Sequence, residues 1–331
     1  MPSRPAPPKG CLPPATLRRM TDLAARLLYA LAALLARLPW PWLYRLGDLL
    51  AVAVLRPRSR ESRVTACNLQ IAYPHMHPSQ RDELRQAILR TTARQLMETL
   101  RLWTRPHAEN LALIREQHGT ELLDAAIAGG RGVIIAAPHY GNWELLNQWL
   151  AARTPLAILY APPESKVGEA FLNRVRADDR TDGQPPRVTQ VRAEAAGVRQ
   201  LFKRLAAGGV LGILPDQQPK QGDGEFGPFF GKEALTMTLL GRLAARSGAV
   251  VLMAYCERID SHRAGPGFAL HLESTPAAVA DADPRIAVAA LNAAIERIAR
   301  RDPAQYQWTY KRYSLRPSGR GEDNPYWPQC Y

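Results

Sequence analysis

The sequence contains little cysteine, and the cysteines that it has are widely separated. Its four thiols, at Cys11, Cys67, Cys256 and Cys330, show none of the short spacings that zinc ligands have. So few thiols in 331 residues also cannot build the disulfide framework of a small secreted domain. These absences exclude both classes of protein and favour a reducing, cytoplasmic setting.

The sequence also lacks an apolar run long enough to cross a bilayer, which takes roughly 20 residues. From Asp22 to Leu55 the chain is strongly apolar, but charged residues interrupt it, and the uninterrupted part runs only from Leu27 to Ala36. No small-residue cleavage site follows it cleanly, so we do not expect a removable signal peptide.

This apolar segment has the pattern of an amphipathic helical hairpin. Leucines recur at helical spacing before the helix-breaking Pro39 and Pro41. Aromatic residues suited to a headgroup boundary follow, and arginines suited to anionic lipid come next. These residues are Leu27, Leu28, Leu31, Leu34, Leu35, Leu38, Trp40, Trp42, Tyr44, Arg56, Arg58, Arg60 and Arg63. We expect residues 22–63 to associate with a membrane; a hairpin packed on a soluble core is the alternative.

Acidic residues are few relative to basic ones. The chain has 30 Asp and Glu against 43 Lys and Arg, a formal net charge of +13. Such an excess predicts an anionic partner, and nucleic acid, acidic phospholipid and an acidic carrier protein all qualify. The sequence contains no zinc finger, RNP motif or basic-region zipper. Charge alone does not choose among these partners.

The remaining chain is rich enough in apolar residues for a large core. Hydrophobic residues make up 46% of the sequence, which excludes wholesale disorder. We expect a disordered, basic, Pro-rich extension over residues 1–21, followed by the membrane-associating segment. A catalytic domain is expected over residues 64–317, and a flexible tail over residues 318–331.

Helix and strand patterns alternate through this domain. Helices are predicted over residues 81–103, 121–128, 145–152 and 193–207, and strands over residues 132–137, 155–160 and 210–214. A glycine-containing loop is predicted from Gly222 to Gly231. The alternation favours an α/β fold with a mixed central sheet and helices on both of its faces.

The most informative segment is the apolar strand that ends at His139. Asn142 is a suitable helix N-cap, and Glu144 would lie in the first turn of the helix that follows. A histidine there can remove a proton from a hydroxyl while the Glu144 carboxylate fixes its tautomer. The alternative is a structural histidine, with Glu144 stabilised by the helix N-terminus.

A second strand ends in the same way, at Pro215 and Asp216. Strand ends of an open α/β sheet form one crevice, so Asp216 and Gln217 would position sugar hydroxyls or buttress the base; a solvated turn is the alternative for Asp216. The block from Gln305 to Tyr313 alternates aromatic and polar residues. It predicts a strand or interfacial loop that places Lys311 and Arg312 on phosphate, or else a surface that stacks nucleic-acid bases.

Together these motifs resemble the late acyltransferases of lipid A biosynthesis, the lauroyl and myristoyl transferases. The resemblance covers residues 24–317, and the joint order of its motifs is far more specific than any one of them. The motifs are Leu38-Pro39, Tyr44-Arg45-Leu46-Gly47, Asn68-Leu69, Tyr73-Pro74, Met97-Glu98-Thr99, His139-x4-Glu144, Leu214-Pro215-Asp216-Gln217, Pro228-Phe229-Phe230-Gly231, Pro303-x-Gln305-Tyr306-x-Trp308, Lys311-Arg312-Tyr313 and Arg316-Pro317.

The resemblance implies a glycerophosphate-acyltransferase-like fold at the cytoplasmic face of the inner membrane. It implies transfer of a fatty acyl chain from acyl carrier protein to a hydroxyl of a Kdo-bearing, phosphorylated lipid A precursor, without cofactor or nucleic acid. His139 would be the general base and Glu144 its orienting carboxylate. The functional aspartate falls on Asp216, and the functional arginine falls on Arg174, with Arg176 as the alternative.

Three other functions fit parts of the same pattern. An acyltransferase with the same core acting on a glycerophospholipid or an aryl or aminoacyl lipid would share the base. A hydrolase would use His139 on water and release free fatty acid. A non-catalytic basic module would bind membrane or nucleic acid, with binding that falls steeply with salt.

Overall fold

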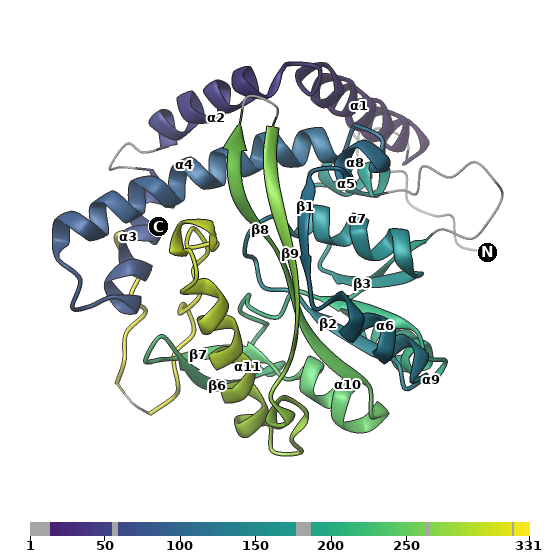
Figure 1. Cartoon of the computed structure of the whole chain (residues 1–331). Helices are drawn as coiled ribbons and strands as arrows, with labels where there is room; N and C mark the ends of the chain where they lie inside the picture. The colour runs from purple at the N-terminus through teal and green to yellow at the C-terminus, as the bar shows by residue number, and fades with distance from the viewer. Residues whose placement is uncertain (1–13, 55–58, 177–186, 263–264, 320) are drawn as a thin grey trace, which may run out of the picture.

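The computed structural model describes residues 14–54, 59–176, 187–262, 265–319 and 321–331 (Figure 1). Its α-helices are α1 (Pro14–Leu35), α2 (Trp40–Val54), α3 (Arg60–Ala72), α4 (Pro78–Leu102), α5 (His107–Leu111), α6 (Thr120–Ala128), α7 (Trp143–Arg153), α8 (Lys166–Val175), α9 (Ala195–Ala206), α10 (Leu239–Ser247) and α11 (Pro284–Ala299). Its strands are β1 (Ile114–His118), β2 (Val133–Ala136), β3 (Leu156–Tyr160), β4 (Val188–Arg192), β5 (Val210–Ile213), β6 (Gly224–Phe229), β7 (Lys232–Met237), β8 (Val250–His262) and β9 (Gly265–Ser274). Two 3-10 turns, Ala277–Ala280 and Pro303–Gln305, complete the described elements.

A mixed, mostly parallel sheet of seven strands forms the centre of the molecule, in the order β1-β9-β8-β2-β5-β3-β4. Among the described strands of this sheet, β8 and β9 form the one antiparallel pair. Strand β2 lies between β5 and β8, and all four of its residues are buried. A strand covered on both faces needs an unbroken apolar sequence, which explains why β2 reads as a continuous hydrophobic run.

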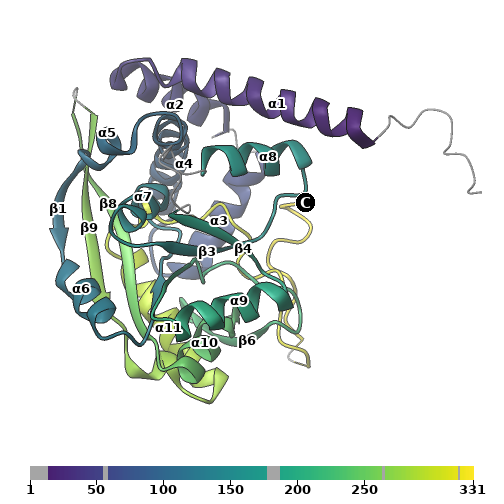
Figure 2. The ribbon, with the colours of Figure 1, turned by 90° about the vertical axis from the view of Figure 1, so that its right-hand side faces the viewer.

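Helices cover both faces of this sheet (Figure 2). Ile134 and Ala136 of β2 pack into a core with α9, α10 and α11. Val133 and Ile135 point to the opposite face and pack with α6 and α7. This alternation is the period-2 geometry of a strand. The predicted α/β architecture is therefore confirmed.

The predicted loop between Gly222 and Gly231 is wrong for most of its length. Residues Gly224–Phe229 form β6, which pairs with β7 in a separate antiparallel hairpin. Gly227 lies where this strand passes close to α11. A Cβ atom at that position would meet the Val288 side chain of α11 at 2.7 Å, so glycine allows the close approach of strand and helix.

The N-terminal apolar segment forms a bent pair of helices that lies across one end of the molecule (Figures 1 and 2). Helices α1 and α2 break before Trp40 and are bent by 117°. In the described parts of the chain, no single helix is both long and apolar enough to cross a membrane. Helix α1 begins inside the segment predicted to be disordered, so that prediction is wrong from residue 14; residues 1–13 lie outside the described residues.

The two sides of α1 are unlike those of a helix that packs in water. Among residues 19–35 of α1, the buried residues are the small Ala25 and Ala32, whereas Leu27 and Leu34 are more than 60% exposed. Small inward residues let the helix lie close to the body, and the large apolar residues point away from it. The result is an uncovered leucine face, formed by Leu27, Leu28, Leu31 and Leu34.

The C-terminal residues pack on the body, so the predicted flexible tail is wrong. Tyr326 is fully buried, and its hydroxyl donates a hydrogen bond to the side-chain oxygen of Asn68 in α3. The Cys67 thiol donates to the backbone oxygen of Pro325 at 3.3 Å. Aromatic residues with buried hydrogen-bond partners hold this segment in place.

Candidate active site

His139 and Asp216 meet at one edge of the sheet. Strands β2 and β5 are parallel neighbours, so the residues that follow each strand emerge side by side. Asp216 is 2% exposed. Its Oδ1 atom lies 2.7 Å from Nδ1 of His139, and its Oδ2 accepts the backbone N–H of His139 at 2.8 Å. The sequence predicted that these two strand ends share a crevice, and the structure brings them together.

The Asp216 carboxylate sets the tautomer of His139. A carboxylate at Nδ1 requires the proton there, which leaves Nε2 unprotonated, with a lone pair that can accept a hydrogen bond or a proton. The side-chain amide of Gln217 lies 3.2 Å from this Nε2 atom and also donates to Gln307 at 3.3 Å. Trp143 packs edge-on against the imidazole, with ring centroids 5.0 Å apart. The imidazole is thus held at both nitrogens.

The electrostatics of Asp216 match this arrangement. Burial opposes ionisation of the carboxyl, but the nearby His139 charge and the hydrogen bonds from His139 outweigh it. The pKa of Asp216 is consequently lower than its ordinary value. The carboxylate therefore stays charged and can stabilise an imidazolium.

Glu144 does not take the place predicted for it beside His139. Its carboxylate forms an ion pair with Arg176, and the side chains of Glu144 and Arg176 are 6% and 19% exposed. Asn142 caps α7 as predicted, accepting the Leu145 N–H at 3.2 Å. Glu144 occupies the first turn of α7, where the helix dipole also favours its charge. Asp216 reaches the imidazole directly from the neighbouring strand, so it replaces Glu144 as the carboxylate on the ring.

The two candidate arginines lie in different surroundings. Arg176, directly after α8, contacts Glu144 near the turn that carries His139. Arg174 is exposed, and its guanidinium lies over the Tyr29 ring of α1 at 4.8 Å from the ring centroid. The structure thus brings Arg176 to Glu144 and places Arg174 beside the apolar helix pair.

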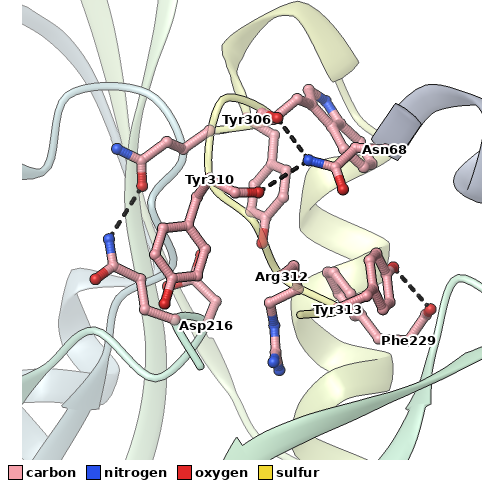
Figure 3. Close-up of a pocket in the computed structure, with 10 residues that line it drawn as sticks. Asn68, Asp216, Phe229, Tyr306, Tyr310, Arg312 and Tyr313 are labelled. Carbon is pink, nitrogen blue, oxygen red and sulfur yellow. Dashed lines mark hydrogen bonds between the residues drawn. The ribbon is translucent and has the colours of Figure 1, made fainter. Parts of the chain in front are cut away.

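A pocket lined by aromatic and polar side chains adjoins Asp216 (Figure 3). Its lining residues are Asn68, Asp216, Gln217, Phe229, Tyr306, Gln307, Trp308, Tyr310, Arg312 and Tyr313. Asn68 donates hydrogen bonds to the backbone oxygens of Trp308 and Tyr310 at 2.6 and 2.9 Å. The Tyr310 hydroxyl accepts the backbone N–H of Gln218 at 3.1 Å. These contacts fix the aromatic segment opposite the end of β5.

The basic pair predicted to bind phosphate divides between two environments. Arg312 is 4% exposed and donates to the Leu235 backbone oxygen and the Thr236 hydroxyl of β7. The Lys311 ammonium lies over the ring of Tyr331, 3.1 Å from its centroid. Residues 306–313 follow the 3-10 turn Pro303–Gln305 as irregular chain, with an isolated β-bridge between Tyr306 and Tyr140 rather than a strand. The two neighbours thus do not present one joint cationic site.

A family model described as bacterial lipid A biosynthesis acyltransferase matches residues 15–314 of this chain. The chain belongs to that family. It is 25% identical over 287 residues to the lipid A biosynthesis lauroyltransferase of Escherichia coli (strain K12), covering 86% of this chain and 90% of that protein. It is 27% identical over 296 residues to the lipid A biosynthesis palmitoleoyltransferase of the same organism, covering 86% and 88%.

A shorter part of the chain is similar to acyltransferases whose name states a different lipid. Over 73 residues, or 22% of the chain, it is 40% identical to the phosphatidylinositol mannoside acyltransferase of Mycobacterium tuberculosis (strain CDC 1551 / Oshkosh). Membership of the lipid A family confirms the resemblance that the sequence motifs indicate, and it identifies the protein as an acyltransferase of lipid A biosynthesis.

Two residues of this candidate site carried no clear signal in the sequence. Gln307 and Tyr310 reach the region of His139 and Asp216 only through the fold, whereas Trp143 follows His139 by four positions. Gln307 and Tyr310 belong to the block that alternates aromatic and polar residues, which was the one available signal. In the described part of the chain, no three His, Cys, Asp or Glu side chains gather as a metal site requires.

Proposed function

We propose that this protein transfers a fatty acyl chain from acyl carrier protein to a hydroxyl of a Kdo-bearing, phosphorylated lipid A precursor, with His139 as general base. The observation that carries the proposal is the pairing of His139 with the buried Asp216 at the sheet edge, in a chain of this family. Residues 64–317 would supply the chemistry and the N-terminal helix pair the membrane contact.

The chemistry requires a base, a stabilised charge and a leaving group. Nε2 of His139 removes the proton of the acceptor hydroxyl while the hydroxyl oxygen attacks the thioester carbonyl carbon. Asp216 stabilises the imidazolium that forms. When the tetrahedral intermediate collapses, the carbon–sulfur bond breaks and the imidazolium gives the proton to the departing carrier thiolate. The products are an ester and a free thiol.

Gln217 and Arg176 have separate roles in this proposal. The Gln217 amide meets Nε2 of His139, where the acceptor hydroxyl must bind, so Gln217 would orient that hydroxyl or donate to the oxyanion. Arg176 would bind a phosphate of the acceptor or of the carrier's pantetheine arm, with Glu144 holding its guanidinium in place. Arg174, beside α1, would meet lipid phosphate at the membrane surface.

The last two residues predicted to bind substrate are assigned differently. Both terminal nitrogens of Arg312 donate to β7, so we assign this residue to the wall of the pocket beside Asp216. Lys311 would reach an anionic headgroup from the rim of the same segment.

The uncovered leucine face supports association with the cytoplasmic face of the inner membrane. Leucine side chains that project from α1 while alanines face the body need an apolar environment other than the protein. The net charge of +13 suits both an anionic leaflet and an acidic carrier protein. We infer that α1 and α2 lie in the interface and bring the crevice to a lipid acceptor.

A mannoside lipid is the second candidate acceptor. It is supported by the 40% identity over 73 residues to a phosphatidylinositol mannoside acyltransferase.

Mass spectrometry of acceptor lipids tests the proposal. Purified protein is incubated with acyl carrier protein thioesters and either a Kdo-bearing lipid A precursor or a phosphatidylinositol mannoside. We expect one added acyl mass on the former, absent with His139→Ala and retained with His75→Ala, an exposed control. Thioester loss without acylation of either lipid would indicate a hydrolase. Full activity of His139→Ala would remove His139 as the base.

A further inference from the structure

A buried carboxylate contacts the turn that carries His139. Glu98, in α4, is 1% exposed. Arg258 of β8 donates to both of its oxygens, from Nε at 2.8 Å and from Nη2 at 2.6 Å. The Asn142 amide donates to Oε2 at 3.2 Å, and the Tyr44 hydroxyl of α2 donates to Oε1 at 2.8 Å. One carboxylate thus joins the catalytic turn, the sheet and the membrane-facing helix pair.

Glu98 determines which way the Asn142 amide points. An asparagine amide has a donor end and an acceptor end that occupy nearly the same space. The carboxylate of Glu98 can only accept, so the NH₂ group must face it. The amide oxygen is thereby turned toward α7, where it caps the Leu145 N–H. The backbone N–H of Asn142 donates to the Cys256 backbone oxygen at 2.8 Å, which fixes the turn itself.

The cost of this arrangement indicates a positioning role. Burying an ion pair removes two charges from water, so such pairs contribute little net stability compared with apolar residues of the same volume. What the pair does supply is a single geometry for Asn142, and so for the start of α7. His139 lies three residues before this cap and Glu144 two residues after it.

We propose that Glu98 is a positioning residue, which holds the His139-to-Glu144 turn through Asn142 and ties it to α2 through Tyr44. This inference rests on the proposed function of His139 as the base. Glu98 itself touches neither substrate nor imidazole. Its effect should therefore appear in the rate of the acyl transfer and in the mobility of the turn.

Three variants separate positioning from simple loss of packing. Glu98→Gln keeps the volume but presents an NH₂ group to a site filled with donors. Asn142→Ser keeps a good N-cap oxygen and removes the NH₂ group that meets Glu98. The double variant tests whether the two act through one another. Glu83→Gln, on the exposed side of the same helix, is the matched control.

We expect Glu98→Gln and Asn142→Ser each to lower kcat about tenfold or more, with the acceptor KM within about twofold. The double variant should fall no more than about threefold below Glu98→Gln alone, because both remove the same contact. Glu83→Gln should behave as wild type. Unchanged kcat in folded Glu98→Gln, or independent losses that multiply in the double variant, would overturn the proposal.

Amide hydrogen exchange of residues 141–146 provides a readout that does not need catalysis. Exchange there should accelerate about tenfold in Glu98→Gln and Asn142→Ser but not in His139→Ala. Should the wild type transfer no acyl group, the proposed function fails while exchange still decides this inference. Tyr44→Phe should raise the exchange of the same residues and lower kcat about threefold; no change in either would remove the link to α2.

Discussion

The Asp216 carboxylate binds His139 twice, through the ring Nδ1 at 2.7 Å and through the backbone N–H at 2.8 Å. The two residues are 77 positions apart in the sequence and are brought together by the parallel pairing of β2 with β5. One buried carboxylate thereby fixes both the position and the tautomer of the imidazole. The register of β2 and β5 therefore determines which carboxylate pairs with the imidazole.

Asp216→Asn should remove most of the activity without unfolding the protein. An asparagine cannot accept from both the ring N–H and the backbone N–H of His139, so one donor is left facing an NH₂ group. We expect kcat to fall about 10²- to 10⁴-fold, the range in which loss of a triad member acts. Asp82→Asn, at a half-exposed carboxylate of α4, is the control. The measurement is the initial rate of acylated-lipid formation; a loss under threefold would contradict the assigned role.

The lowered pKa of Asp216 predicts how stability depends on pH. Because the folded carboxyl has a pKa below its unfolded value of about 3.8, its contribution is fully present above the unfolded pKa and is lost as pH falls through the folded pKa. Urea unfolding from pH 7 to pH 3 should therefore show a smaller acid loss of unfolding free energy for Asp216→Asn than for wild type. Equal losses of unfolding free energy in the two proteins would show that His139 does not lower the pKa of the Asp216 carboxyl in the folded state.

Arg176 and Arg174 should differ sharply in their importance. Arg176→Ala leaves the buried Glu144 without its counter-charge, which costs about 3–5 kcal/mol of unfolding free energy for a fully buried pair and less at a partly exposed arginine. Within the protein, Arg174→Ala removes an exposed contact with Tyr29, worth about 0.5–1 kcal/mol. We expect a large loss of acyl transfer from the first and a loss below threefold from the second. Denaturation with rate measurements compares them, and an equal effect on rate would contradict the placement of Arg176.

The packed C-terminus predicts a stability effect from one hydroxyl. Tyr326→Phe leaves the buried Asn68 oxygen without that donor, which costs about 1–3 kcal/mol. Trp327→Ala, at the neighbouring residue that is 67% exposed, should cost less than about 0.5 kcal/mol. Urea denaturation of both variants makes the comparison. A tail that behaved as predicted from the sequence would give no difference between them.

The leucine face of α1 should control binding to lipid. Replacing Leu27, Leu31 and Leu34 together by serine removes three side chains, each worth about 1.5–3 kcal/mol when buried in lipid. Affinity for vesicles with anionic lipid should fall about a hundredfold or more. Ile286→Ser, at an exposed apolar residue of α11, is the control. Sedimentation with vesicles measures this, and unchanged binding would remove α1 as the membrane contact.

The sequence by itself determined the local features of the site. The apolar run of β2, its end at His139 and the Asn142 cap depend on residues close together in the chain, so pattern and turn chemistry predict them. The exposed leucines of α1 and the break before α2 follow from helical period and proline in the same way. The ordered set of motifs also identified the family.

Only the tertiary structure decided which groups pair with one another. The sequence spacing predicts that Glu144 reaches His139. In the structure, the register of β2 and β5 brings Asp216 to the imidazole, and Glu144 forms an ion pair with Arg176. The burial of Tyr326 depends on Asn68, 258 residues earlier. Such contacts join residues that are distant in sequence, and their partners are chosen by packing and by the need to satisfy every buried polar group. A single sequence carries no local signal for that choice.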